Sequence, residues 1–201
     1  PTLILTLTRS AWIGTLVAMV VLMFLRNWRL LVLVPALAVV VGLLLPRAVE
    51  RRMGSFASPD TSGWDRVYML RAGAAMIGNH PLFGVGPEMV AEVYPVYVVP
   101  EANQRENPHL HNNFVQIAAE RGIPCAIAWL WVVTLGFGAS VVAYRRAADD
   151  PVARGLSAGA MGVILSGFVA GLFEFNFGDS EFQMLFLFAM SLPWVLERAR
   201  P

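Results

Sequence analysis

The residues best suited to chemistry lie together in one polar segment, Asp65 to Gly122, between long apolar runs. All three histidines of the chain fall in it, and a single residue separates His109 from His111. A neutral imidazole is an effective general base near pH 7. Arg66 and Arg71 lie in the same segment, and a guanidinium suits phosphate oxygens through its planar fork. We expect the chemistry to take place in this segment.

The backbone conformation around the two histidines decides what the pair can do. In an extended segment both imidazoles share a face, which permits a metal site, whereas in a helix they lie about 200° apart and leave one catalytic histidine. Pro108 and the good N-cap residue Asn112 favour a helix that starts at His111, so we expect the imidazoles to be split. No metal is expected, because no third ligand lies at short spacing and His80 is distant. The plainer alternative is two histidines that only cap and pack.

Arg66 and Arg71 lie five residues apart on an expected helix from Asp65 to Asn79, which separates them by about 140° around its axis. On a straight helix they cannot both face one ligand. Arg66 is favoured, because Asp65 can start the helix and leave Arg66 in the first turn, where anions are stabilised. Arg71 has the respectable alternative of a solvated charge. The apolar face of this helix is expected to carry Val67, Leu70, Ala74 and Ile77.

Two further charged residues are candidates for contacts with a substrate. Arg9 lies within or at the outer end of an apolar run, where an arginine is costly and by default lines a polar cavity. Its alternative is to snorkel to the outer headgroups. Glu120 is the second candidate, with pairing to Arg121 or capping of the loop as its plainer interpretations. The single cysteine, Cys125, allows no internal disulfide and is expected to be a small buried hydrophobe.

Composition assigns the chain to the membrane proteins. Of its 201 residues 57% are hydrophobic and only 14% are charged, well below the roughly one quarter usual in soluble domains. A soluble chain of this length could not bury so much apolar surface. The formal net charge of +1 offers no case for a nucleic-acid partner. The chain opens at Pro1 in apolar sequence without a basic leader, so we expect the C-terminal part of a longer multi-pass protein.

The apolar runs predict an all-α integral membrane protein with about five transmembrane helices in this chain. Residues 1–46 would hold two of them and the tail of a missing element, and residues 123–201 would hold three. Residues 47–122 would form a large helical extracytoplasmic loop domain that carries the site. Residues 89–99 are too short to cross and would lie on the membrane surface or pack under the loop. The expected spans are residues 7–25, 30–45, 123–144, 155–173 and 182–196.

The short loops fix the expected orientation, because arginine is enriched in cytoplasmic loops. Seven arginines oppose three acids on one side of the expected bundle, which marks that side as cytoplasmic. The long polar loop and the acidic turn at residues 174–181 then face outward. The arginines are Arg26, Arg29, Arg145, Arg146, Arg154, Arg198 and Arg200, and the acids are Asp149, Asp150 and Glu197.

Four features together resemble the O-antigen ligase/polymerase superfamily of bacterial envelope glycosyltransferases. LTRSAWIG around Arg9 is similar to the family's Ser-Arg-Gly segment, although the order here is Thr-Arg-Ser. DRVYMLRAGAAMIGNHPLFGVGP is close to its arginine-led helix followed by His-Pro-Leu-x-Gly-x-Gly. HLHNNFVQIAAERGI resembles its His-Asn-x-x-Leu/Phe-Gln followed by Glu-x-Gly, and a large external loop between spans is the fourth feature. Pro124 stands in place of a usual glycine and leaves the subtype open.

The resemblance implies a metal-independent transferase without cofactors, acting on the periplasmic side of the bacterial inner membrane. Its donor would be a glycan on undecaprenyl diphosphate, and its acceptor lipid A-core or another lipid-linked glycan. His111 would be the base that activates the acceptor hydroxyl, Arg9 and Arg66 would hold the diphosphate, and His109 would be secondary. The remaining candidates for substrate binding are Arg71, Asn112 and Glu120.

Two rival functions stay open beside this interpretation. A transporter of an anionic substrate would use Arg9 and the loop arginines as its pathway, but transporters usually show internal repeats with broken helices, and none is visible here. A non-catalytic scaffold would use the outer loop to bind a partner. Within the transferase class, the sequence does not separate ligase from polymerase.

Overall fold

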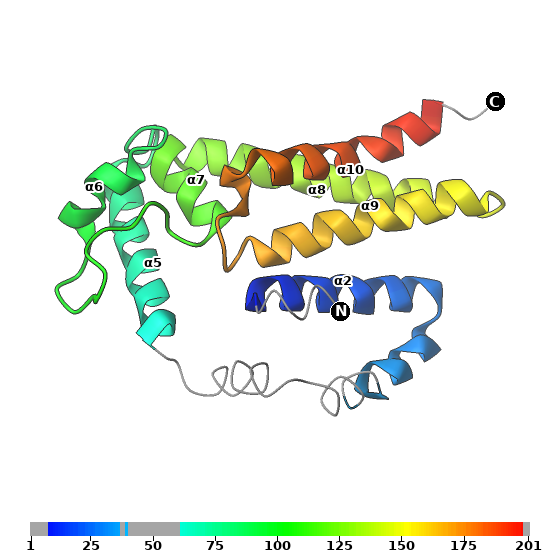
Figure 1. The fold of residues 1–201 in the computed structure, drawn as a ribbon. Coiled ribbons are helices and arrows are strands. Elements are labelled where there is room, and N and C mark those ends of the chain that lie inside the picture. Colours follow the sequence, from blue (N-terminus) through cyan, green and yellow to red (C-terminus); the bar gives the residue numbers. More distant parts are fainter. Residues whose placement is uncertain (1–7, 37–38, 40–60, 199–201) are drawn as a thin grey trace. The chain divides into compact units, whose positions relative to one another are not determined.

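The computed structural model describes residues 8–36, 39 and 61–198, and every regular element in that part of the chain is a helix (Figure 1). The greater part of the expected second span and the expected domain boundary at residue 46 lie outside the described residues. The elements are α2 (Arg9–Arg26), the 3₁₀ helix η1 (Trp28–Val32), α5 (Thr61–Asn79), α6 (Val90–Tyr97), α7 (Asn113–Arg121), α8 (Ile123–Arg146), α9 (Pro151–Ala170), the 3₁₀ helix η2 (Asn176–Gly178) and α10 (Ser180–Arg198).

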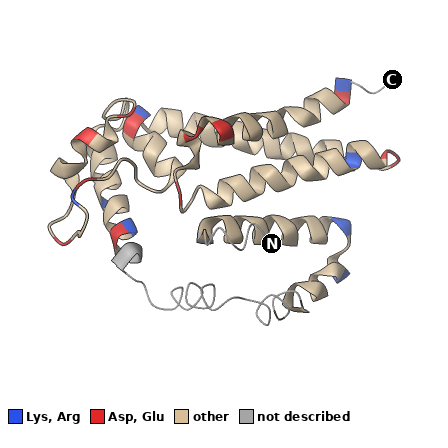
Figure 2. Cartoon of the chain, in the orientation of Figure 1, with Lys and Arg blue, Asp and Glu red and all other residues tan. Residues whose placement is uncertain are grey.

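The expectation of an all-helical protein with apolar spans is confirmed in this part of the chain. α8 and α9 are long and apolar enough to cross a membrane, and α2 is a shorter apolar helix. Charged residues gather at the ends of the long helices and in α5 to α7, and the middles of α8, α9 and α10 carry none (Figure 2). The total of five spans remains a prediction.

The chain forms two compact units. One comprises Pro1–Ser58, Gly136–Val169 and Leu185–Pro201, and the other comprises Pro59–Leu135 and Ala170–Met184. In the first unit α8 and α10 approach closely at Gly136, where an added Cβ would lie 2.7 Å from the Cε of Met190. Small residues permit such contacts between membrane helices. All the candidate site residues between positions 65 and 122 belong to the second unit.

The core of the second unit corrects the expected buried face of α5. Met69, Ala72 and Met76 are buried there. Of the expected face, Ile77 packs partly buried against this core, whereas Val67, Leu70 and Ala74 are exposed. The helix also begins at Thr61, before the expected start at Asp65. The buried face differs because it is set by what packs against it. Its partners in the core are Val90 and Tyr94 of α6, together with Leu110 and Ala119.

Residues 89–99 therefore pack under the loop, which was one of the two expected alternatives. They form α6, whose Val90 and Tyr94 are almost completely inaccessible to solvent. Burial also raises the pKa of the Tyr94 hydroxyl, so this side chain is neutral in the core. α6 is thus a structural element of the second unit.

The glycine-rich turn after α5, which contains Gly84 and Gly86, is hydrogen-bonded to the end of α7. The N–H of Gly86 donates to the carbonyl of Glu120 at 3.0 Å. Gly84 (φ 68°) and Gly122 (φ 85°) both adopt left-handed backbone that favours glycine. An added Cβ would lie 2.2 Å from the carbonyl carbon of Glu120 at the first position and 2.1 Å from the carbonyl oxygen of Leu82 at the second. The two backbones can meet only because both residues lack a side chain.

Candidate functional site

The segment that carries the two histidines is held by the start of α7. Asn112 is the N-cap, and its side-chain oxygen accepts from the N–H of Val115 at 2.9 Å, as expected. The N–H of Leu110, a fully buried residue, donates to Oε1 of Gln116 at 2.7 Å. Between these two hydrogen-bonded positions His111 has φ 51°, a backbone region that residues other than glycine rarely occupy. The backbone at His111 is therefore fixed from both sides.

A second set of hydrogen bonds joins the start of α7 to the turn between α9 and α10. The N–H of Asn113 donates to the carbonyl of Gly171 at 2.7 Å, and its side-chain amide donates to Oδ1 of Asn176 at 2.6 Å. Asn112 Nδ2 donates to the carbonyl of Leu172 at 2.9 Å. Two segments about 60 residues apart in sequence are thereby held side by side.

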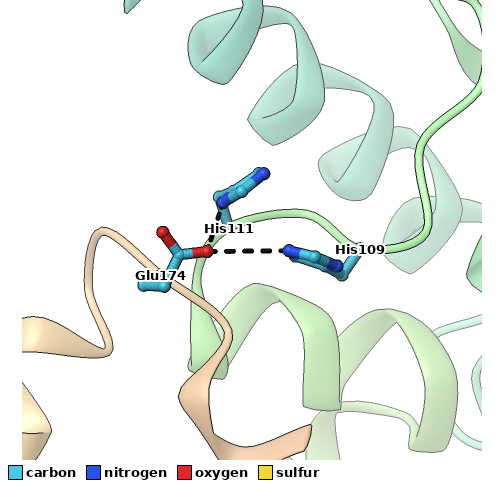
Figure 3. A group of neighbouring side chains, drawn as sticks. All are labelled: His109, His111 and Glu174. Carbon is cyan, nitrogen blue, oxygen red and sulfur yellow. Dashed lines mark hydrogen bonds and ion pairs between the residues drawn. The ribbon is translucent and has the colours of Figure 1, made fainter. Parts of the chain in front are cut away.

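This junction brings Glu174 to the histidines. Nδ1 of His111 is in direct contact with Oε1 of Glu174, and Nε2 of His109 lies 3.6 Å from the same oxygen (Figure 3). On the other carboxylate oxygen, Oε2, Nη2 of Arg66 lies 3.7 Å away. The result is one carboxylate shared by two imidazoles and one guanidinium.

The expected separation of the two imidazoles is wrong. Their ring centroids lie 4.4 Å apart. α7 begins at Asn113, so neither His109 nor His111 belongs to the helix, and the helical spacing that would have split them does not apply. The left-handed backbone at His111 turns its ring toward the same carboxylate that His109 approaches.

The carboxyl of Glu174 is ionised at neutral pH. Burial opposes its charged form, but interactions with His109 and His111 and the charge of Arg66 outweigh that effect and hold the pKa of Glu174 well below its ordinary value. An ionised carboxylate only accepts hydrogen bonds, so Nδ1 of His111 must be the donor in their contact. In the neutral imidazole this leaves the lone pair on Nε2, the tautomer that a general base requires.

A comparison with known proteins identifies the family of the chain. The model of the O-antigen ligase family matches residues 2–130, well over half of the sequence. The chain belongs to the O-antigen ligase family. It is therefore a glycosyltransferase-type membrane enzyme for lipid-linked glycans. No curated protein matches it. Glu174 lies beyond the matched residues.

Of the two arginines expected on this helix to bind substrate, the structure brings Arg66 to the Glu174 carboxylate and leaves Arg71 apart. Arg71 is exposed, and its guanidinium lies 6.0 Å from the ring centroid of Tyr68 on the same helix. Arg66 does not lie in the first turn of its helix, as was expected, because α5 begins at Thr61. Its side chain instead forms an ion pair with Glu174. Arg9 is the first residue of α2, and its side chain lies outside the described part of the structure.

Glu120 lies in a different place, on the inner face of α7. Its side chain is 5% exposed, and it accepts from Nε2 of Gln116 at 2.8 Å and from Nη1 of Arg121 at 3.3 Å. The pairing with Arg121 that the sequence suggested is present. Since Gln116 also binds the N–H of Leu110, a chain of hydrogen bonds runs from Glu120 to the residue between the two histidines.

The two histidines and Glu174 also form a group that could hold a metal ion. His109, His111 and Glu174 can each provide one ligand atom, and these atoms all lie within 4.8 Å of one another. Glu174 is the third ligand that sequence reasoning missed. The only signal for it was an acidic turn with three acids, none distinguished from the others. The nearby Arg66 guanidinium disfavours an additional cation at this carboxylate.

Proposed function

We propose that this O-antigen ligase family member transfers a glycan from undecaprenyl diphosphate to a hydroxyl of lipid A-core or of another lipid-linked glycan. The proposal rests above all on the contact between His111 and the ionised Glu174 beside Arg66. That contact supplies an oriented base next to a cation that suits a phosphate oxygen.

In the proposed reaction His111 activates the acceptor. Its Nε2 takes the proton of the acceptor hydroxyl while that oxygen attacks the anomeric carbon of the donor sugar. The bond from this carbon to the diphosphate oxygen breaks, and the bonding electron pair leaves with the diphosphate. Glu174 holds the imidazole through Nδ1 and stabilises the imidazolium that forms, as the carboxylate does in hydrolase triads.

The leaving group is stabilised by arginine. Arg66 is 39% exposed in its side chain and can bind a diphosphate oxygen while it remains beside Glu174. Arg9 is proposed as the second diphosphate ligand, and His109 as a secondary contact. Arg71 and Asn112 are proposed for outer substrate contacts. A diphosphate neutralised in this way needs no proton to leave, so we propose a reaction without metal.

The proposed site faces the periplasm of a bacterium. The chain would cross the inner membrane about five times, with the arginine-rich short loops in the cytoplasm. This orientation puts the second unit on the side where the lipid-linked donor and the acceptor are both accessible.

The proposal is tested with the whole protein in proteoliposomes that contain a lipid-diphosphate-linked glycan and, in separate reactions, each candidate acceptor. We expect transfer that persists in EDTA, and the product distinguishes a ligase from a polymerase. Loss of transfer in EDTA with recovery on adding a divalent ion would contradict the metal-independent mechanism. Anion uptake into the vesicles without any transfer would support the transporter instead.

The role of Arg66 is tested against Arg71 as a matched control on the same helix. Arg66→Gln is expected to raise the KM for the donor about tenfold, because one charge-assisted phosphate contact is lost. Arg71→Gln should have a much smaller effect. Equal effects of the two substitutions on donor KM would contradict the assignment of Arg66 to the diphosphate.

A further inference from the structure

A cavity of about 410 Å³ opens in the second unit beside the histidines. This volume falls within the roughly 300–1,000 Å³ of small-molecule binding sites. The cavity is formed by residues of α7, α8, the glycine-rich turn and the segment that leads from Glu174 into α10. Its walls include Glu88, Glu120, Trp129, Phe175, Phe177 and Gln183.

The walls combine aromatic rings with acceptors and donors of hydrogen bonds. Trp129 and Phe177 meet edge to face with ring centroids 5.4 Å apart, and both rings line the cavity. Glu88 and Glu120 provide carboxylates, and Gln183 provides an amide. Aromatic surface with a few convergent polar groups suits a ligand that has apolar faces and a rim of hydroxyls, as a pyranose ring has.

The charges of the cavity exclude the diphosphate as its occupant. Its two carboxylates, Glu88 and Glu120, face a single arginine, Arg121, whose guanidinium already lies 3.3 Å from Glu120. One uncompensated acid repels an anion and accepts hydrogen bonds from neutral hydroxyls. The proposed diphosphate ligand Arg66 lies on α5, and none of the described side chains of α5 is among these walls.

The cavity adjoins the proposed base. Phe175, which lines it, directly follows Glu174, and its ring centroid lies 6.0 Å from that of His109. Glu120 is linked through Gln116 to the N–H of Leu110, the residue between the histidines. A ring seated against these walls is therefore held by the same hydrogen-bonded framework that fixes the imidazoles.

We propose that this cavity is the subsite for the acceptor's sugar ring, with Trp129 as its main stacking surface and Glu88 as an acceptor for sugar hydroxyls. This inference rests on the proposed function, because the bound hydroxyl is the one that His111 deprotonates. The donor, by contrast, is held through its diphosphate on the Arg66 side.

The test compares two tryptophans of α8 in the whole protein, by steady-state transfer kinetics. Trp129→Ala is expected to raise the KM for the acceptor about tenfold, because it removes a stacking surface, and to leave the donor KM and the kcat at saturating acceptor close to wild type. Trp129→Phe should recover part of the loss. Trp131, which is 64% exposed and outside the cavity, is the matched control, and Trp131→Ala should behave as wild type.

A binding measurement without donor separates this inference from the proposed reaction. Methyl glycosides of glucose, galactose, mannose and N-acetylglucosamine are each examined by saturation-transfer NMR with the wild-type protein and both variants. We expect at least one glycoside to bind the wild type and Trp131→Ala but not Trp129→Ala. An unchanged acceptor KM in Trp129→Ala, a rise in donor KM instead, or glycoside binding that survives this substitution would overturn the subsite. If the wild type transfers no glycan but still binds a glycoside that Trp129→Ala does not bind, the proposed transfer reaction is overturned and the subsite is not.

Discussion

His111 occupies a left-handed backbone conformation, φ 51°, directly before the N-cap of α7. Such a conformation costs on the order of 1–3 kcal/mol for a residue with a side chain and persists only where the surroundings impose it. Here the hydrogen bonds of the Leu110 and Asn113 backbones impose it from either side. The strain directs the imidazole at Glu174 and so serves the chemistry we propose.

The charge of Glu174 should matter for catalysis. Glu174→Gln keeps the size of the side chain but can no longer hold an imidazolium by charge, and we expect kcat for glycan transfer to fall by at least about tenfold. Glu181→Gln, in an exposed acid at the start of α10, is the control and should retain wild-type kcat. Wild-type kcat in Glu174→Gln would show that the carboxylate has no part in activating His111.

The stability that Glu174 provides should decrease as the pH falls into the acid range. Its pKa is lowered by interactions with His109, His111 and Arg66, which outweigh burial, so its stabilising effect is present above the unfolded-state pKa of about 4.3 and is lost as the pH falls below it. In thermal unfolding, Glu174→Gln should lower Tm at pH 7, and its difference from wild type should shrink below about pH 4. A difference that grows toward low pH would contradict the assignment.

At the scale of elements, the close backbone contact between the glycine-rich turn and the end of α7 stabilises the second unit around the site. Gly84→Ala and Gly122→Ala each place a Cβ within 2.5 Å of backbone at a positive φ, and each should destabilise the fold by about 1–3 kcal/mol or more. Gly78→Ala in α5, where nothing lies within 4 Å, should change stability by less than about 1 kcal/mol. Equal unfolding temperatures for all three variants would argue against a stabilising role of this backbone contact.

The elements of the loop could largely be predicted from the sequence. Asn112 and Gly122 mark the two ends of α7 by well-known capping chemistry, and the apolar runs after Ile123 correspond to α8, α9 and α10. The face of α5 could not be predicted, because Met69 and Met76 are buried by Leu110 and Tyr94, which are distant in sequence. Periodicity alone favoured the wrong face, since both faces of α5 are apolar.

The candidate site was only half predictable. His111 and Arg66 could be proposed from local sequence, but Glu174 lies 63 residues after His111 and carries no local signature. Its approach depends on the backbone of Asn113 meeting Gly171, a contact between loops that no spacing reveals. The proximity of His109 to His111 depends on the φ of a single residue, which the sequence does not encode in any simple way.

At the scale of the whole molecule, the proposed orientation predicts which loops lie on the periplasmic side of the inner membrane. In a Cys125→Ala background, Glu106→Cys in the long loop should react with a membrane-impermeant maleimide on intact spheroplasts. Asp149→Cys in the arginine-rich short turn should react only after lysis. Both positions are exposed, so access to the reagent depends on the side of the membrane. The reverse labelling pattern would contradict the orientation.

The most direct test of the central proposal is the rate of glycan transfer by His111→Ala with and without added imidazole. We expect the substitution to reduce kcat by about 10²–10⁴-fold and imidazole to restore part of the rate in a concentration-dependent manner, because a free base can occupy the vacated space. The control is His80→Ala, in an exposed histidine of the turn after α5. Its transfer rate should equal that of the wild type both with and without imidazole. Wild-type transfer by His111→Ala without imidazole would contradict the assignment of His111 as the base.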